Sequence, residues 1–263
     1  MYRIFDSHVH IYPDKIAAKA SDAIGDFYHI KMNFDGGVQT LLERGAAAGV
    51  SRFLVHSVAT SARQVISIND FLLGECALYP DKFIGFATLH PDFEDPYGEL
   101  KRVKSAGLHG VKLHPDFQKF EISDAVMDDA YAAMAELNMP VLFHTGDVRY
   151  NYSNPAHVPV VLKRHPGLTV ICAHLGGYSQ WDEADECLKG SDVYVDTSSS
   201  QFGLPPERVK QLIYRYGTDR VLFGSDYPMW DAKDEIEQLL KLGLTPREYE
   251  MIFAENLAQL LGE

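Results

Sequence analysis

The chain has 263 residues, 46% of them hydrophobic, a size at which an α/β barrel commonly forms as one domain with an ample core. Its 37 acidic residues outnumber 24 basic ones, the formal net charge is −13, and no lysine- and arginine-rich run occurs. This composition argues against a nucleic acid or an anionic membrane surface as partner.

The compartment can also be predicted from the sequence. Three scattered cysteines, Cys76, Cys172 and Cys187, are too few for a disulfide framework. No apolar stretch approaches membrane-spanning length, and the first residues run directly into a polar motif that leaves no room for a signal peptide. We therefore expect a cytoplasmic protein, and a homo-oligomer is compatible with the sequence.

Short apolar runs alternate with helical segments along the whole chain, without a linker between them. We expect strands at residues 4–8, 52–56, 83–89, 110–113, 141–144, 169–174, 193–196 and 221–224. We expect helices at 37–49, 62–79, 99–106, 123–137, 158–164, 181–189, 206–216, 232–242 and 246–261. Eight such βα units predict a single (β/α)8 TIM barrel spanning 1–263. Two long connections, 11–35 and 146–156, are predicted to overhang its mouth as lids.

Polar residues recur where these apolar runs end: His8, His10, His56, His90, His114, His144, His174, Asp196 and Asp226. In a parallel barrel the carboxyl ends of the strands meet at one mouth, which holds the active site. Imidazole and carboxylate are ligands of divalent transition metals. The pattern therefore predicts a metal site at the mouth.

The strongest local motif is Asp6-Ser7-His8-Val9-His10. Strand residues two apart point to the same face, so His8 and His10 can share one ion. Asp6 has the same parity one step deeper. It could fix the tautomer of an imidazole from behind, or be a capped polar residue of the barrel floor.

These motifs resemble the amidohydrolase superfamily, and within it the amidohydrolase-related branch of metal-dependent hydrolases and decarboxylases. The resemblance runs from residue 6 to residue 226 and includes the phrases Val111-Lys112-Leu113-His114-Pro115, Phe143-His144-Thr145-Gly146, Ala173-His174-Leu175-Gly176-Gly177 and Phe223-Gly224-Ser225-Asp226-Tyr227-Pro228. It implies that His8, His10, His144 and Asp226 hold the metal and that His174 lies beside the metal-bound water. His174 and Asp226 would then be the catalytic residues.

Lys112 and His114 share one strand face, so both are expected inside the barrel. In two-metal members of the superfamily a strand-four lysine is carbamylated and bridges the ions, which Lys112 could do. The alternative that we favour is one metal, with Lys112 or His114 holding a substrate carboxylate.

Further residues are weaker candidates. Arg63 and Arg149 could contact an anionic substrate. The lid candidates for substrate contact are Tyr12, Tyr28 and Lys31 in the first long connection, and Arg149, Tyr150 and Tyr152 in the second. His56 and His90 could line the pocket, although a hydrogen-bonded structural histidine at a barrel rim is at least as common.

The resemblance and the residues together predict a metal-dependent hydrolase. A metal-bound hydroxide would cleave an amide, lactone or ester bond of a small, carboxylated substrate. The alternatives are a non-oxidative decarboxylase of a small aromatic or unsaturated acid, which would use the same ligands, and a non-catalytic metal-binding barrel. We expect one zinc ion per chain, with manganese, iron or cobalt as substitutes.

Overall fold

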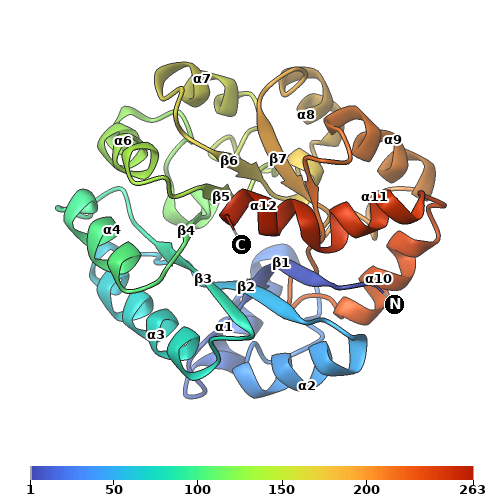
Figure 1. Cartoon of the computed structure of the whole chain (residues 1–263). Helices are drawn as coiled ribbons and strands as arrows, with labels where there is room; N and C mark the ends of the chain where they lie inside the picture. The colour runs from blue at the N-terminus through green and yellow to red at the C-terminus, as the bar shows by residue number, and fades with distance from the viewer. Residues whose placement is uncertain (1, 263) are drawn as a thin grey trace.

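The computed structural model describes residues 2–262 and contains the predicted (β/α)8 TIM barrel (Figure 1). Its eight strands pair in parallel, each with the next along the chain. A bridge between Val9 and Tyr227 and a hydrogen bond from the His10 amide to the Tyr227 carbonyl bring the last strand back to the first. The strands are β1 (Phe5–His10), β2 (Arg52–His56), β3 (Phe83–Thr88), β4 (Gly110–Leu113), β5 (Val141–Phe143), β6 (Val170–Cys172), β7 (Val193–Asp196) and β8 (Val221–Leu222).

Most of the helices form the outer ring that Figure 1 shows around the strands, while α12 (Asn256–Leu261) crosses one end of the barrel. The helices are α1 (Ala17–Tyr28), α2 (Val38–Ala48), α3 (Val65–Leu78), α4 (Pro96–Ser105), α5 (Pro115–Gln118), α6 (Asp128–Glu136), α7 (His157–Arg164), α8 (Trp181–Cys187), α9 (Pro206–Tyr216), α10 (Ala232–Leu240), α11 (Pro246–Glu250) and α12 (Asn256–Leu261). Within residues 2–262, none of these helices is both long enough and apolar enough to cross a bilayer.

The apolar residues form two cores, as the alternation of strand side chains requires. The larger core fills the space between the strands and the surrounding helices. The smaller one gathers inward-facing residues of six strands with two residues of the C-terminal segment: Phe5, Leu54, Ile84, Phe86, Leu142, Ile171, Ala173, Leu222, Ala254 and Leu257. This inner core and α12, which crosses one end of the barrel in Figure 1, close the floor and leave the other end for the polar residues.

The connection predicted as a loop at 11–35 contains a helix, α1, so that prediction was wrong in its secondary structure. Four alanines in its first seven residues favour a helix, because alanine has the highest helix propensity. The short helix α5 was also not predicted. The helix predicted at 246–261 is interrupted by a π-helical turn, Met251–Glu255, between α11 and α12.

Gly45 lets α2 pack closely on β2. A Cβ atom added there would lie 2.1 Å from the ring of Phe53, which is itself buried in the core. We predict that Gly45→Ala destabilises the fold by about 1–3 kcal/mol, the usual cost of overpacking. Gly74→Ala in α3 is the control, because nothing lies within 4 Å of its added Cβ and alanine favours a helix. Urea unfolding of both variants measures the difference, and equal stabilities would contradict the prediction.

Candidate metal centre

One pocket at the barrel mouth collects most of the residues predicted for the site. His8, His10 and Asp226 line it from β1 and the segment after β8. The remaining lining comes from other strand ends and from the first connection: Ile24, Tyr28, Met32, His114, Phe117, His144, His174, Tyr178, Ser199, Pro228 and Met229. The mouth is therefore lined by imidazoles, one carboxylate and several aromatic rings.

His8 is held by two strand-end partners. Its Nδ1 lies 2.8 Å from Oδ2 of Asp196, at the end of β7, while its Nε2 lies 3.5 Å from Oδ1 of Asp226. Asp196 also accepts hydrogen bonds from the backbone amides of His174 and Ser198, both at 3.0 Å. A carboxylate that fixes one nitrogen of an imidazole directs the other toward a metal. Asp196 therefore orients His8 from behind.

Asp6 does not have that orienting role. Its carboxylate accepts hydrogen bonds from the hydroxyl and the amide of Ser225, at 2.5 and 2.9 Å, and from the amide of His8 at 3.3 Å. Of the two functions considered from the sequence, the geometry matches the capped polar residue of the barrel floor. Asp6 ties β1 to the segment that carries Asp226.

Asp226 lies between the two imidazoles of β1. Its Oδ1 is 3.6 Å from Nε2 of His10, similar to its distance from His8, and its Oδ2 accepts a hydrogen bond from the Ser199 hydroxyl. Burial raises the pKa of Asp226 to about 6, although the Ser199 hydrogen bond and the charge of Lys112 oppose the shift. The backbone of Asp226 has a left-handed φ of 63°, a costly conformation for a residue with a side chain that recurs at functional sites.

His174 follows β6, and its backbone conformation departs from the alternation of that strand. Strand alternation places Cys172 in the outer core and Ala173 in the inner core, so the next side chain should point outward. A left-handed φ of 61° at His174 turns the ring into the pocket instead. Its Nε2 then lies 2.9 Å from Nδ1 of His144. His174 also forms a group of metal-ligand dimensions with His8 and Asp226.

His114 and His144 form a second group at the mouth. Their rings stack with centroids 4.0 Å apart, and together with Asp116 they have the spacing of metal ligands. The Tyr28 hydroxyl lies 2.9 Å from Nε2 of His114 and 3.3 Å from Nε2 of His144. The C-terminal end of α1 thus covers the site, as predicted for this connection.

The predicted cationic residues lie outside the pocket lining. Lys112 is fully buried and lines no part of this pocket, with its Nζ 3.2 Å from Nε2 of His8, the ring nitrogen that also faces Asp226. Arg63 is exposed and lines no part of this pocket. Arg149 forms an ion pair with Asp147 and donates to the carbonyl of Phe27, which joins the loop after β5 to α1.

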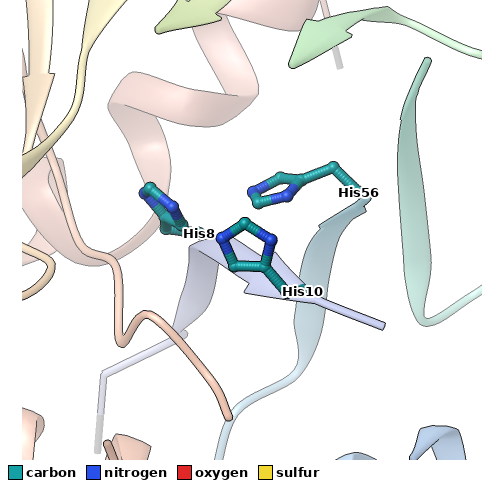
Figure 2. A group of neighbouring side chains, drawn as sticks. All are labelled: His8, His10 and His56. Carbon is teal, nitrogen blue, oxygen red and sulfur yellow. The ribbon is translucent and has the colours of Figure 1, made fainter. Parts of the chain in front are cut away.

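His56 lies beside the His8 and His10 rings, as Figure 2 shows. The three imidazoles form a group of metal-ligand dimensions, with the His56 ring centroid 4.4 Å from that of His10. His90, the other strand-end histidine considered for the pocket, is not part of its lining. It accepts a hydrogen bond from the amide of Asp92 instead.

The donor set suits a divalent metal. Burial lowers the pKa values of His8, His10 and His144 well below the usual range, with the charge of Lys112 adding to the effect. Neutral imidazoles keep the lone pair that a metal needs. The buried Nδ1 of His10 has no hydrogen-bond partner among the described residues, and a carboxylate stands beside the imidazoles. These residues fit a bound cation.

The sequence analysis assigned no function to two acidic residues of the site, Asp116 and Asp196. Asp196 stood out only as a polar residue at a strand end, without a motif to assign it. Asp116 follows Pro115 in a segment expected to be a loop, and burial raises its pKa to about 6. The signal available for both was their position after a strand, at the mouth where the histidines gather.

We predict that Asp196→Asn weakens divalent metal binding by about 10–100-fold, the usual cost of losing the residue that orients a ligand. Asp92→Asn is the matched control, because Asp92 also pairs with a strand-end histidine but its side chain is 83% exposed. Titration against a chelator of known affinity measures both. An unchanged affinity in Asp196→Asn would contradict the orienting role.

Comparison with known proteins identifies the family of the chain. The family model described as Amidohydrolase matches residues 5–262. The protein YabD of Bacillus subtilis (strain 168), described as an uncharacterized metal-dependent hydrolase, is 20% identical over 230 residues, which cover 86% of this chain and 80% of that one.

Two solved structures share the fold. The dihydroxybenzoic acid decarboxylase of Polaromonas sp. JS666, with bound manganese and 2-nitroresorcinol as inhibitor, has a TM-score of 0.77 and 15% identity over 100% of this chain and 97% of that one. A putative 2-pyrone-4,6-dicarboxylic acid hydrolase from Pseudomonas putida has a TM-score of 0.71 and 20% identity over 100% and 98%.

The fold and the site define a TIM barrel whose mouth gathers imidazole and carboxylate groups with the spacing of metal ligands. The match over nearly the whole chain identifies it further: the protein belongs to the amidohydrolase family and is a metal-dependent enzyme of that family. Its relatives by fold include both decarboxylases and a putative hydrolase, and the expected family resemblance is confirmed.

Proposed function

We propose that the protein is a metal-dependent hydrolase that cleaves an amide, lactone or ester bond of a small substrate. The observation that carries the proposal is the position of Asp226, whose Oδ1 lies 3.5 and 3.6 Å from the Nε2 atoms of His8 and His10. A metal held there by these residues would lower the pKa of water toward neutrality and polarise a carbonyl. The description of YabD as a metal-dependent hydrolase supports the same reaction class.

The side chains around the site supply the proton transfers. Asp226 accepts a proton from the attacking water and passes it to the leaving group, while the Ser199 hydroxyl holds its other oxygen in place. His174, with Nδ1 held 3.1 Å from the Ser198 carbonyl, directs Nε2 toward the substrate carbonyl or the water. Tyr28 and α1 cover the reacting groups and exclude bulk solvent.

The substrate is proposed to be a small molecule with a carboxylate near the bond that is cleaved. Lys112 and both arginines lie outside the pocket lining. A metal held by the site would supply the positive charge for that carboxylate, and His114 and Tyr28 would be its hydrogen-bond donors. Nucleic acid and membrane partners are not part of the proposal.

We propose zinc as the ion, one per chain, because imidazole-rich ligation suits it, with manganese, iron or cobalt as substitutes. The proposed ligands are His8, His10, His144 and Asp226. The alternative is a second ion bridged by a carbamylated Lys112, whose Nζ lies 3.2 Å from Nε2 of His8. The three free cysteines are consistent with a cytoplasmic location, which we propose as well.

The pocket also favours a second reaction. Phe117, Tyr178 and Tyr28 form an aromatic wall beside the imidazoles, which suits a planar aromatic or unsaturated acid. A non-oxidative decarboxylase would use the same metal to orient such an acid, with a proton delivered to carbon as carbon dioxide leaves.

Metal analysis of the purified protein, combined with a screen of carbonyl compounds, tests the proposal. We expect about one divalent ion per chain and turnover of a lactone, ester or amide without release of carbon dioxide. Carbon dioxide from an aromatic acid would establish the decarboxylase instead. Stoichiometric metal without turnover of either class would support a non-catalytic barrel.

A further inference from the structure

His56 is a buried histidine whose ring nitrogens are unpaired. It is 0% exposed, and neither Nδ1 nor Nε2 has a hydrogen-bond partner among the described residues. A neutral imidazole carries one N–H donor and one lone pair, and a buried polar group without a partner costs about 1–3 kcal/mol. A histidine kept in this state needs a ligand that its protein neighbours do not provide.

The position of His56 points to the nature of that ligand. The sheet register pairs His56 with His10 on the adjacent strand, so both side chains leave the sheet on the same side. Figure 2 shows the His56 ring, from β2, directed into the space beside the two rings of β1. One nitrogen from each of the three imidazoles lies within 4.8 Å of the others, which is the spacing of ligands around a single ion.

Substrate contact does not account for His56. It is absent from the lining of the pocket at the mouth and from that of the neighbouring apolar pocket, although His10 lines both. Its neighbours on the open side of the ring are the imidazoles of His8 and His10, with ring centroids 5.0 and 4.4 Å away. An ion between the three rings would satisfy a lone pair on each of them.

We propose that His56 is a further ligand of the metal, which adds an imidazole from β2 to the proposed ligands His8, His10, His144 and Asp226. The ion is a borderline divalent cation of the zinc and cobalt class, which prefers imidazole nitrogen. Asp226 supplies carboxylate oxygen to the same ion, since its Oδ1 faces the Nε2 atoms of both histidines of β1. The second strand of the barrel thus contributes to the metal centre.

Cobalt binding to a cysteine variant tests coordination directly. The metal-free protein is titrated with Co²⁺, and we expect His56→Cys to gain an intense near-ultraviolet thiolate-to-cobalt band that saturates at one equivalent. The wild type should lack this band despite its own three cysteines. His90→Cys is the matched control, because it places a thiol at the end of the next strand, where His90 has a backbone partner. If His56 only packs against its neighbours or contacts the ion through a water molecule, the thiol that replaces it would give no such band.

His56→Asn gives an independent readout without a thiol. We expect it to weaken Co²⁺ binding by at least about tenfold and to change the visible cobalt spectrum, because a ligand is lost. If His56→Cys does not fold, this variant decides alone, and an unchanged affinity and spectrum would overturn the proposal. The proposal would also be overturned if folded His56→Cys bound one Co²⁺ without the near-ultraviolet band.

The inference rests on the metal-binding part of the proposed function and not on the hydrolytic reaction, so the test measures binding without turnover. A wild type that binds no divalent ion would contradict the proposed metal centre as a whole. A wild type that binds one Co²⁺ while both His56 variants behave as wild type would contradict only the role of His56.

Discussion

Replacing His8 and His10 together by alanine is expected to abolish stoichiometric metal binding and to reduce turnover to background. Both Nε2 atoms face Oδ1 of Asp226, and the change removes two imidazoles from one donor set. The change removes the pair of imidazoles that shares the ion from one strand, and the remaining ligands come from separate elements, so the ion is expected to be lost during purification. Metal content per chain, measured on purified protein, is the readout.

His29→Ala with His109→Ala is the control for the double variant, because neither residue lies in the pocket lining. It should retain one equivalent of metal. Both proteins should keep the far-ultraviolet circular dichroism spectrum of the wild type. Unchanged metal content in the His8 and His10 double variant would show that the ion binds elsewhere, for example at the group of His114, Asp116 and His144.

The barrel was predictable because its signal is repeated. Most strands are short apolar runs that end in a polar residue or are followed closely by one, and alternation within β2 sends Leu54 into the inner core and His56 to the side of His8 and His10. A single misjudged segment does not obscure such a pattern. The helix α1 was missed because the length of the connection was interpreted as a loop, although its alanines favour a helix.

The orientation of the site residues could not be predicted from alternation. Cys172 and His174 have the same strand parity, yet Cys172 packs in the outer core while the left-handed φ of His174 turns its ring into the pocket. Such a φ is imposed by tertiary contacts, here the hydrogen bond from the His174 amide to Asp196. Sequence spacing also carries no information on which nitrogen of a ring faces a partner, so the role of Asp196 was not assigned.

Substitution of His174 is the second change from which we expect a large effect on activity. We predict that His174→Asn retains one equivalent of metal and lowers kcat by about 10²–10⁴-fold, the range for a lost acid or base. Nδ1 of His174 is held by the Ser198 carbonyl, and its Nε2 lies 2.9 Å from Nδ1 of His144, so one nitrogen is fixed while the other is paired with a second imidazole that lines the pocket. Asparagine keeps a donor near Ser198 and removes the group that can transfer a proton.

The competing assignment is that His174 is itself a ligand, since it forms a group of metal-ligand dimensions with His8 and Asp226. Metal content and kcat, measured on the same preparation, separate the two. Under the acid or base assignment, activity falls while the metal remains. Under the ligand assignment, metal and activity are lost in proportion, and Co²⁺ added to saturation restores part of the turnover. Near-wild-type kcat with intact metal would contradict both assignments. The His174 ring would then have only a structural role, as a packing partner of His144 in the pocket.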